Sequence, residues 1–381
     1  MTGLLETPYG TQDFLPAEAA IKRATEQKIF ELFTSFGYEE VVTPTMEYLE
    51  TLTTSSGRAQ EPHLFKMFDR NNRTLALRHE MTTPIARLAV SRLKDSPLPL
   101  KLSYNTNVFR FRNNQPGRQC EFYQAGVELL GISNAFADAE IISLAAQALS
   151  VSGLKDFKIC LGQVEFVGGL IENLSVDVQS KIKSAIERHD IVALNNLDID
   201  DNLKKIPTLQ GGQEILTIAQ SIADNERSRR ALNNLAEIYR LLEIYGVADK
   251  ITFDLGLIRD FEYYTGMVFE AYSHGVGYSL AGGGRYDNML KDFGAACPAT
   301  GFALGIERIL DARKFQGVAD NSIAKDFYLS YAEGRENLAI KKAAELRADK
   351  KVVEVSLTPQ NKTDAEKSCA AKRCMELIYL A

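Results

Sequence analysis

The sequence has few of the residues that form disulfide frameworks or zinc sites. Its five cysteines and four histidines are dispersed along the chain, and no two cysteines have the Cys-x-x-Cys spacing. Because such frameworks and metal centres need clustered ligands, the sequence predicts neither a disulfide scaffold nor a metal site, and no cofactor is expected. The cysteines are Cys120, Cys160, Cys297, Cys369 and Cys374.

Long apolar runs and an excess of positive charge are also lacking. No apolar stretch reaches the ~18 residues of a membrane-spanning helix, and the opening segment MTGLLETPYG has no basic region followed by an apolar run. The net charge of −6 gives no support for a broad nucleic-acid surface, which leaves only a local basic patch. We therefore expect a cytoplasmic protein, and the 381 residues predict two or three domains.

The most informative stretch is residues 109–131, FRFRNNQPGRQCEFYQAGVELLG. A short apolar run, a loop rich in Asn, Gly and Pro, and an alternating run together predict an antiparallel hairpin. In its second strand Gln124, Gly126 and Glu128 share one face, because strand side chains alternate. The charges could belong to a solvated hairpin. Alternatively, the loop arginines could bind an anion, and a buried Glu128 would then need a cationic or donor partner.

Before this hairpin, helical spacing follows Pro16 and stops at Gly37, and Tyr38–Pro44 is typical of a strand. A second hairpin is predicted over residues 64–77, and a helix follows with Thr82 or Thr83 as its N-cap. Glu80, at the strand–helix junction, could stabilise the helix N-terminus or receive a ligand's ammonium group.

After the hairpin, a helix is predicted over residues 132–153, and residues 165–248 lose strand-like runs and read as an inserted helical subdomain. The glycine run of AGGGRYD (281–287) could form a phosphate cradle or a tight turn. TGFALGIERIL (300–310) predicts a strand entering a helix that carries Arg308, and a lone arginine there is usually on the surface. Residues 324–381 alternate β, α, β, α, β, which predicts a small domain with a parallel sheet.

This order of features resembles the catalytic core of class II aminoacyl-tRNA synthetases. More specifically, it is similar to the family of histidyl-tRNA synthetase and its paralogue, the regulatory subunit of ATP phosphoribosyltransferase. The resemblance implies an α+β fold in which helices flank an antiparallel sheet. It places the core in residues 1–164 and 249–316, the helical insertion in 165–248 and the small α/β domain in 324–381. It also implies a homodimer formed through residues 17–44.

The resemblance further implies a pocket for free histidine. Glu128 would meet the imidazole, whereas Glu80 and Thr82 would meet the α-amino group with Gln124 beside it. Arginines would hold the carboxylate, with Arg110 alternatively on an α-phosphate, and Arg308 matches the arginine that lies at the ATP γ-phosphate. The implied histidine-binding residues are Glu80, Thr82, Arg110, Gln124, Glu128, Arg259, Tyr263 and Tyr264.

Two departures from the synthetases bear on activity. Arg112 stands where the synthetases carry an adenine-recognising glutamate, and a cation cannot accept the adenine amino hydrogen bond. The loop is also rich in neutral residues, and the C-terminal domain is short. The sequence therefore favours a non-catalytic regulatory subunit that binds histidine and acts with a short-form catalytic subunit in the first step of histidine biosynthesis. A histidyl-tRNA synthetase with a shortened C-terminus and a stand-alone histidine sensor are the alternatives. The favoured reading predicts no tRNA binding, and Arg308 could be a remnant of a phosphate site.

Overall fold

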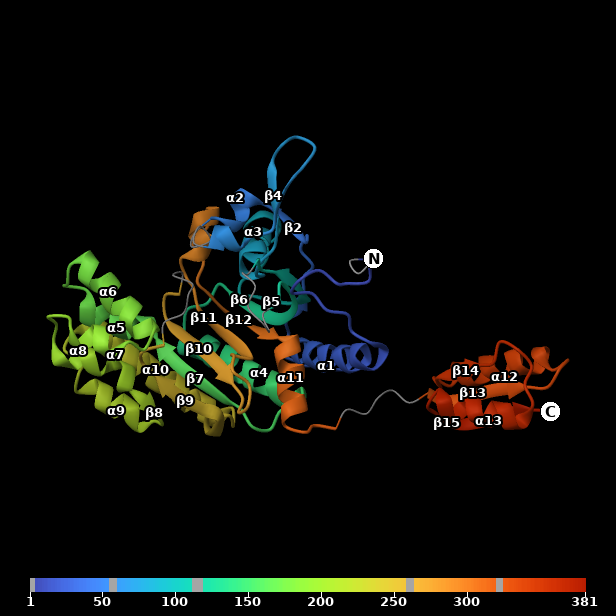
Figure 1. Cartoon of the computed structure of the whole chain (residues 1–381). Coiled ribbons are helices and arrows are strands. Elements are labelled where there is room, and N and C mark those ends of the chain that lie inside the picture. The colour runs from blue at the N-terminus through green and yellow to red at the C-terminus, as the bar shows by residue number, and fades with distance from the viewer. Residues whose placement is uncertain (1–3, 55–59, 112–118, 258–263, 320–324) are drawn as a thin grey trace. The chain divides into compact units, whose positions relative to one another are not determined.

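The computed structural model describes residues 4–54, 60–111, 119–257, 264–319 and 325–381. Contacts divide the chain into two compact units, residues 1–13 with 22–318 and residues 14–21 with 319–381. The larger unit is built on a nine-stranded sheet (Figure 1). Its strands lie in the order β1 (Glu39–Glu40), β5 (Leu100–Phe109), β6 (Glu121–Leu130), β12 (Ala299–Gly305), β11 (Ala281–Arg285), β10 (Met267–Tyr272), β7 (Lys158–Gln163), β9 (Ile251–Asp254) and β8 (Gln210–Gly211).

The sheet confirms the predicted fold class. Neighbouring strands are antiparallel except in the β1–β5 and β7–β9 pairs. The hairpin predicted from residues 109–131 is the β5–β6 pair, in which Phe109 lies opposite Glu121 and Leu100 opposite Leu130. Its second strand, β6, therefore runs through the middle of the sheet, between β5 and β12.

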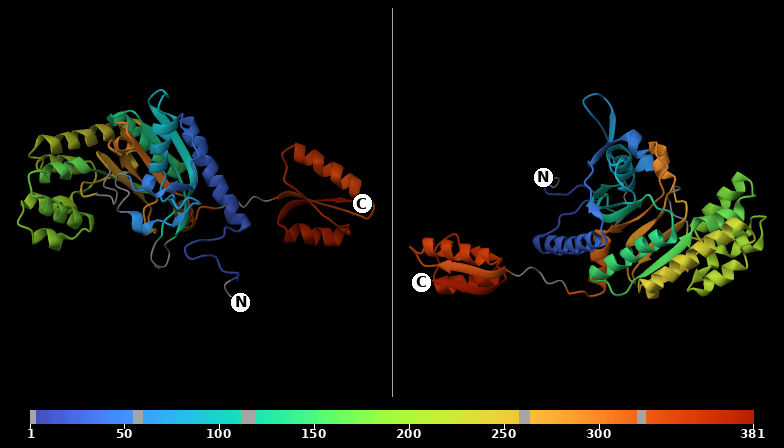
Figure 2. Two further views of the ribbon diagram at one scale, coloured as in Figure 1. Left: turned by 90° about the horizontal axis from the view of Figure 1, so that it is seen from above. Right: turned by 180° about the vertical axis from the view of Figure 1, so that it is seen from behind.

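The two faces of β6 have different environments. Ala125, Val127 and Leu129 belong to the main hydrophobic core, whereas the alternate residues face the other side. Helices cover the core face, and α4 and α10 also pack against each other (Figure 2). The helices that contribute to this core include α1 (Pro16–Ser35), α4 (Ala135–Val151), α10 (Glu226–Ile244) and α11 (Ile306–Phe315).

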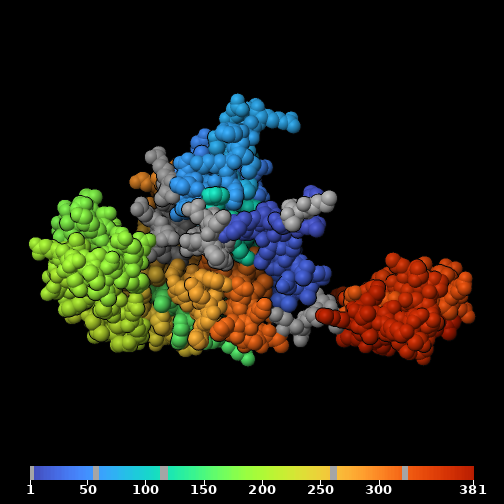
Figure 3. Space-filling model, in the orientation of Figure 1, coloured from blue at the N-terminus to red at the C-terminus, as the bar shows by residue number. Residues whose placement is uncertain are grey.

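The opposite face of the sheet is partly covered by α3 (Thr82–Arg92), which follows a three-stranded sheet. That sheet has the order β2 (Met46–Tyr48), β4 (Thr74–Leu77) and β3 (Lys66–Phe68), and α2 (Leu49–Leu52) packs on it. The β3–β4 hairpin predicted over residues 64–77 projects from the core (Figure 3). The predicted strand Tyr38–Pro44 is wrong in length, because only Glu39–Glu40 pair with β5 before the chain turns toward β2.

The insertion is helical, as expected, and consists of α5 (Val164–Ile171), α6 (Val176–Glu187), α7 (Ile191–Asn195), α8 (Asp201–Lys205), α9 (Glu214–Gln220) and α10. It also contains β8, which the composition did not predict. Gln210 pairs with Asp254 and Gly211 with Phe253 across β8 and β9, so this strand extends the main sheet. None of the helices in the described ranges is long and apolar enough to cross a membrane.

The smaller unit contains the β-α-β-α-β order predicted for residues 324–381. Its parallel sheet has the order β14 (Val353–Val355), β13 (Lys325–Tyr331) and β15 (Cys374–Leu380). The helices α12 (Glu336–Ala348) and α13 (Lys362–Ala371) both contact this sheet.

Candidate functional site

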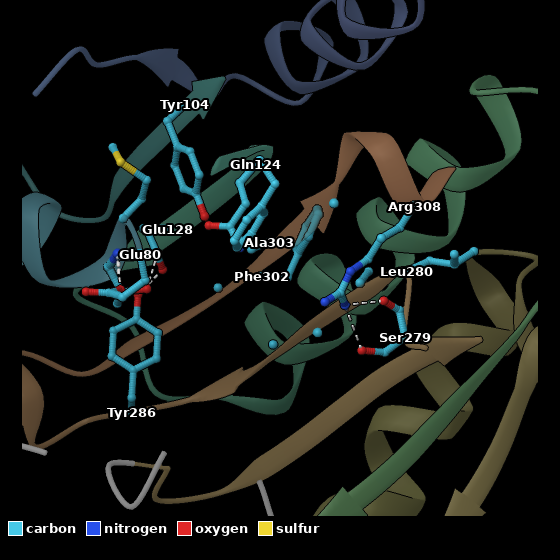
Figure 4. Close-up of a pocket in the computed structure, with 18 of the residues that line it drawn as sticks. Glu80, Tyr104, Gln124, Glu128, Ser279, Leu280, Tyr286, Phe302, Ala303 and Arg308 are labelled. Atoms are coloured by element: carbon cyan, nitrogen blue, oxygen red, sulfur yellow. Dashed lines mark hydrogen bonds between the residues drawn. The ribbon is translucent and has the colours of Figure 1, made fainter. Parts of the chain in front are cut away.

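A pocket lies on the face of the sheet opposite α4 and α10, over β6, β12 and β11 (Figure 4). It brings together most of the residues that the sequence nominated. Glu80, Glu128 and Tyr286 gather at one end and Arg308 with Ser279 at the other. The nominated residues that line it are Glu80, Thr82, Arg110, Gln124, Glu128, Tyr264 and Arg308. Arg259 and Tyr263 lie outside the described residues.

Glu128 is the most buried of the nominated residues that the structure describes, with 2% of its surface exposed. The Thr82 hydroxyl donates to Oε1 at 2.9 Å, and the Tyr286 hydroxyl donates to Oε2. Burial raises the pKa of Glu128 to about 8, the two hydrogen bonds oppose that shift, and the nearby Glu80 charge adds to it. The chain therefore supplies donors to this carboxylate even without a ligand, which the sequence did not predict.

The space around the Glu128 carboxylate depends on glycines in β6 and in the neighbouring strand β12. Gly301 is paired with Glu128 across β12 and β6, and a Cβ built on Gly301 would be 2.0 Å from Glu128 Oε2. A Cβ on Gly126 would be 2.4 Å from the Tyr104 hydroxyl. Since real Cβ atoms do not approach so closely, both positions require glycine for the observed packing.

The glycine run 282–284 lies in β11, in extended conformation. The prediction of a tight turn with positive φ is therefore wrong. A Cβ on Gly283 would be 2.6 Å from the Phe302 Cβ, and one on Gly284 would be 2.7 Å from the Tyr264 ring. The atoms nearest to these two added carbons are backbone oxygens, the Gly301 carbonyl at 2.2 Å and the Met267 carbonyl at 2.6 Å, so both the neighbouring strands and the side chains require glycine at positions 283 and 284.

Glu80 stabilises the beginning of α3. Its carboxylate accepts from the Thr82 N–H at 2.6 Å and from the Thr83 N–H at 2.9 Å. The predicted N-cap at Thr82 or Thr83 is wrong, because Met81 occupies the cap position and has no side-chain cap bond. Of the two roles considered for Glu80, the structure shows the one at the helix N-terminus.

Gln124 contributes a buried side-chain amide to the pocket. The residue is 8% exposed and lines the pocket, and its Oε1 has no hydrogen-bond partner among the described residues. Buried amide oxygens are nearly always paired. A donor brought by a ligand would satisfy this one.

The two nominated arginines in the described part of the chain have backbone contacts. Arg110 Nε donates to the His79 carbonyl at 2.9 Å, and its guanidinium lies 5.2 Å from the Phe122 ring centroid. Arg308 donates to the Ser279 carbonyl at 2.6 Å. It is partly buried and lines the pocket, whereas a lone arginine on such a helix usually lies on the surface.

Tyr286 is one of the described pocket residues that the sequence did not nominate. It follows Arg285, whose guanidinium forms a buried ion pair with Asp138 at 2.7 Å and also bonds Asp287 at 2.9 Å. Asp287 in turn accepts from the Ala299 N–H at 3.0 Å. These contacts of Arg285 and Asp287 fix the end of β11. They thereby position Tyr286, whose hydroxyl donates to Glu128. In the sequence, the polar residues Arg-Tyr-Asp directly after the glycine run were the signal that could have identified Tyr286.

The loop between β5 and β6 is described only at its ends. Arg112 and the neighbouring residues through Arg118 lie outside the described residues. Cys120 is buried and its N–H donates to the Gly10 carbonyl at 2.7 Å, which ties the N-terminal segment to the hairpin.

Comparisons with known proteins agree on one family. The family model described as histidyl-tRNA synthetase matches residues 10–309. The chain is similar to the ATP phosphoribosyltransferase regulatory subunit of Moorella thermoacetica, at 40% identity over 97% of this chain and 96% of the relative. It is also similar to the ATP phosphoribosyltransferase regulatory subunit of Desulforamulus reducens, at 42% identity over 81% and 79% of the two chains.

Solved structures show the same relationship. The crystal structure of an ATP phosphoribosyltransferase regulatory subunit/histidyl-tRNA synthetase from Bacillus halodurans is similar with a TM-score of 0.88, 32% identity and 99% coverage of both chains. Histidyl-tRNA synthetase from Nostoc sp. PCC 7120 has the same fold, with a TM-score of 0.85 and 20% identity over 99% of this chain and 92% of the other. The chain therefore belongs to the histidyl-tRNA synthetase-like family of ATP phosphoribosyltransferase regulatory subunits.

Proposed function

We propose that this chain is the non-catalytic regulatory subunit of an ATP phosphoribosyltransferase. It works with a short-form catalytic subunit in the first step of histidine biosynthesis and is required for that subunit's activity. The observation that carries the proposal is the similarity, over nearly its whole length, to relatives that bear this name. A homodimer through residues 17–44 is part of the proposal.

The pocket is the proposed site for free histidine. The imidazole ring meets Glu128, and the α-amino group meets Glu80 and the unpartnered oxygen of Gln124. Thr82 fits beside the amino group, because a hydroxyl that donates to Glu128 can still accept from an ammonium. Arg110 and Arg259 hold the carboxylate, with Tyr263 and Tyr264 as walls. Histidine then biases the complex toward an inhibited state, and by linkage the substrates of the partner weaken histidine binding.

We propose that the chain has no synthetase activity because the residue that would recognise adenine has changed. A cation at Arg112 replaces the glutamate that would read adenine, and Arg308 remains as a remnant of the phosphate site. Its guanidinium already donates to the Ser279 carbonyl. The second candidate function is histidyl-tRNA ligation, which is favoured by the family-model match and by the location of Arg308 in the pocket.

One experiment separates the two functions. The chain is co-expressed with the short phosphoribosyltransferase of the same organism and purified through a tag on either one. The proposal predicts a stable complex that forms phosphoribosyl-ATP, whereas the separated catalytic subunit is much slower. Histidine-dependent ATP–pyrophosphate exchange by this chain alone would instead establish the synthetase, and failure to form the complex would contradict the regulatory role.

A further inference from the structure

The Glu128 carboxylate lies buried at the end of the pocket that Glu80 and Tyr286 also line. Its hydrogen-bond donors among the described residues are the hydroxyls of Thr82 and Tyr286, and no ion pair links it to a described cation. Two hydroxyl donors are a weak replacement for the water that a carboxylate loses on burial. The carboxylate therefore favours the protonated form.

The residues around Glu128 reinforce this preference. Glu80 approaches from the start of α3 and adds a second negative charge, whereas burial raises the pKa of the Tyr104 phenol in β5 well above its usual value. Tyr264 and Tyr286 also line the pocket. Arg110 lines the same pocket, but its Nε donates to the His79 carbonyl.

The carboxylate also has no room to withdraw. Gly301 lies directly beneath it, and even one added carbon there would be 2.0 Å from Oε2. Thr82 and Tyr286 hold one oxygen each. Any ring nitrogen that enters this end of the pocket therefore meets a fixed carboxyl group.

We propose that Glu128 carries a proton in the ligand-free pocket and transfers it to the imidazole ring of histidine on binding. The O–H bond of Glu128 breaks and an N–H bond forms on the ring, so a neutral imidazole is taken up and held as an imidazolium beside a carboxylate. No proton is exchanged with solvent in this step. The inference rests on the proposed histidine site and concerns how that site is regulated by pH.

The transfer sets a pH window for binding. Below the ordinary imidazole pKa of about 6.5, both partners carry a proton and binding must release one. Burial raises the pKa of Glu128 to about 8, so above that pH neither partner carries a proton and binding must take one up. Affinity is therefore highest between the two values and falls up to tenfold per pH unit on either side.

The test uses ¹⁵N-labelled L-histidine and the full-length chain. At pH 7.5 the bound ring is expected to give the nitrogen shifts of an imidazolium, although free histidine is neutral there. Calorimetry in two buffers of different ionisation enthalpy should give almost no net proton uptake at pH 7.5. At pH 9 it should give an uptake close to one proton per site beyond that of the ligand's own amino group, with roughly tenfold weaker binding.

Variants test whether Glu128 causes the loss of affinity above about pH 8, which is the upper limb of the pH profile. Glu128→Gln should abolish the loss of affinity between pH 7.5 and 9 that exceeds the titration of the ligand's own amino group. Tyr286→Phe removes a donor to the carboxylate and should move the upper limb to higher pH. Asp254→Asn is the matched control, because Asp254 is another buried carboxylate with a raised pKa but does not line the pocket, and it should leave the pH dependence of binding unchanged.

The outcomes distinguish this inference from the function on which it rests. A bound ring that stays neutral at pH 7.5, or an upper limb that persists in Glu128→Gln, would overturn the proton transfer while leaving the histidine site intact. Absence of any histidine binding by the wild-type chain would overturn both.

Discussion

Glu307 accepts the backbone N–H of Tyr123 through both carboxylate oxygens, at 3.0 and 2.9 Å. The pairing of β6 with β12 ends at Gln124 and Gly305, so Glu307, in the first turn of α11, continues the ladder with a side chain where the strand has become a helix. The contact ties the strand that carries Gln124 and Glu128 to the helix that carries Arg308. This contact therefore helps to hold the Glu128 end and the Arg308 end of the pocket in place relative to each other.

Glu307→Ala is expected to lower the free energy of unfolding by roughly 1–3 kcal/mol. The substitution leaves the half-buried Tyr123 N–H without its acceptor and loosens the first turn of α11. Urea unfolding followed by circular dichroism measures the change. Glu243→Ala, at an exposed position of α10, is the control and should stay within about 0.5 kcal/mol of the wild type. Equal effects of the two substitutions would remove Glu307 from this structural role.

Gly301→Ala should disturb the pocket more than any exposed glycine substitution. The added carbon would meet Glu128 Oε2 at 2.0 Å and the Val127 carbonyl at 2.4 Å, so either the carboxylate or the strand must shift. We expect roughly 2 kcal/mol or more of destabilisation in thermal unfolding. Gly277→Ala, where the added carbon would have open space, should be nearly neutral. A Gly301→Ala protein with wild-type stability would show that the close approach is not present in solution.

Asp138→Asn should be strongly destabilising, because it leaves the buried Arg285 guanidinium without its main carboxylate. Breaking a buried ion pair in this way costs about 3–5 kcal/mol, and the remaining contact to Asp287 places the expected loss near the lower value. Asp177→Asn breaks the exposed pair with Lys181 and is expected to cost less than about 0.5 kcal/mol. Chemical denaturation of the two variants side by side gives the comparison, and similar losses would contradict a buried pair.

The stability of the ligand-free chain should depend on Glu128 in alkaline solution. Its pKa is raised in the folded protein, so the folded state retains a proton that the unfolded chain releases above about pH 4.5. The stabilisation that this proton provides is complete below pH 4.5 and is lost as the pH rises toward 8. At pH 9 the buried charge costs several kcal/mol, and Glu128→Gln should then be more stable than the wild type by roughly 3 kcal/mol.

That gain should shrink as the pH is lowered from 9 to 6. Melting temperatures at pH 6, 7.5 and 9 check the sign, and a difference between the two proteins that is independent of pH would contradict a buried carboxyl group with a raised pKa.

Part of the site could be predicted from the alternation of side chains along one strand, β6. Gln124 and Glu128 were placed together because alternate residues of a strand share a face, and the β5–β6 pair confirms that arrangement. The fold class was predicted because this order of motifs resembles the catalytic core of class II aminoacyl-tRNA synthetases.

The features that could not be predicted depend on contacts between segments that are distant in the sequence. The glycines of β11 were read as a turn or a cradle, since glycine is unfavourable in strands. The close approach of neighbouring backbone oxygens, together with Phe302 and Tyr264, explains Gly283 and Gly284, and β11 ends just before Tyr286, which donates to Glu128. The cap of α3 was also misplaced, because the acceptor is the carboxylate of Glu80, upstream of the predicted cap residues.

Histidine titration of the reconstituted complex tests the central claim most directly. Formation of phosphoribosyl-ATP is measured with the wild-type chain and with Gln124→Met, which removes the unpartnered amide oxygen while retaining the length of the side chain. The proposal predicts that histidine inhibits the wild-type complex, and that Gln124→Met needs at least about tenfold more histidine for the same inhibition, in line with the ~1–3 kcal/mol value of a hydrogen bond to a charged group. Equal histidine sensitivity with and without this chain would contradict the account.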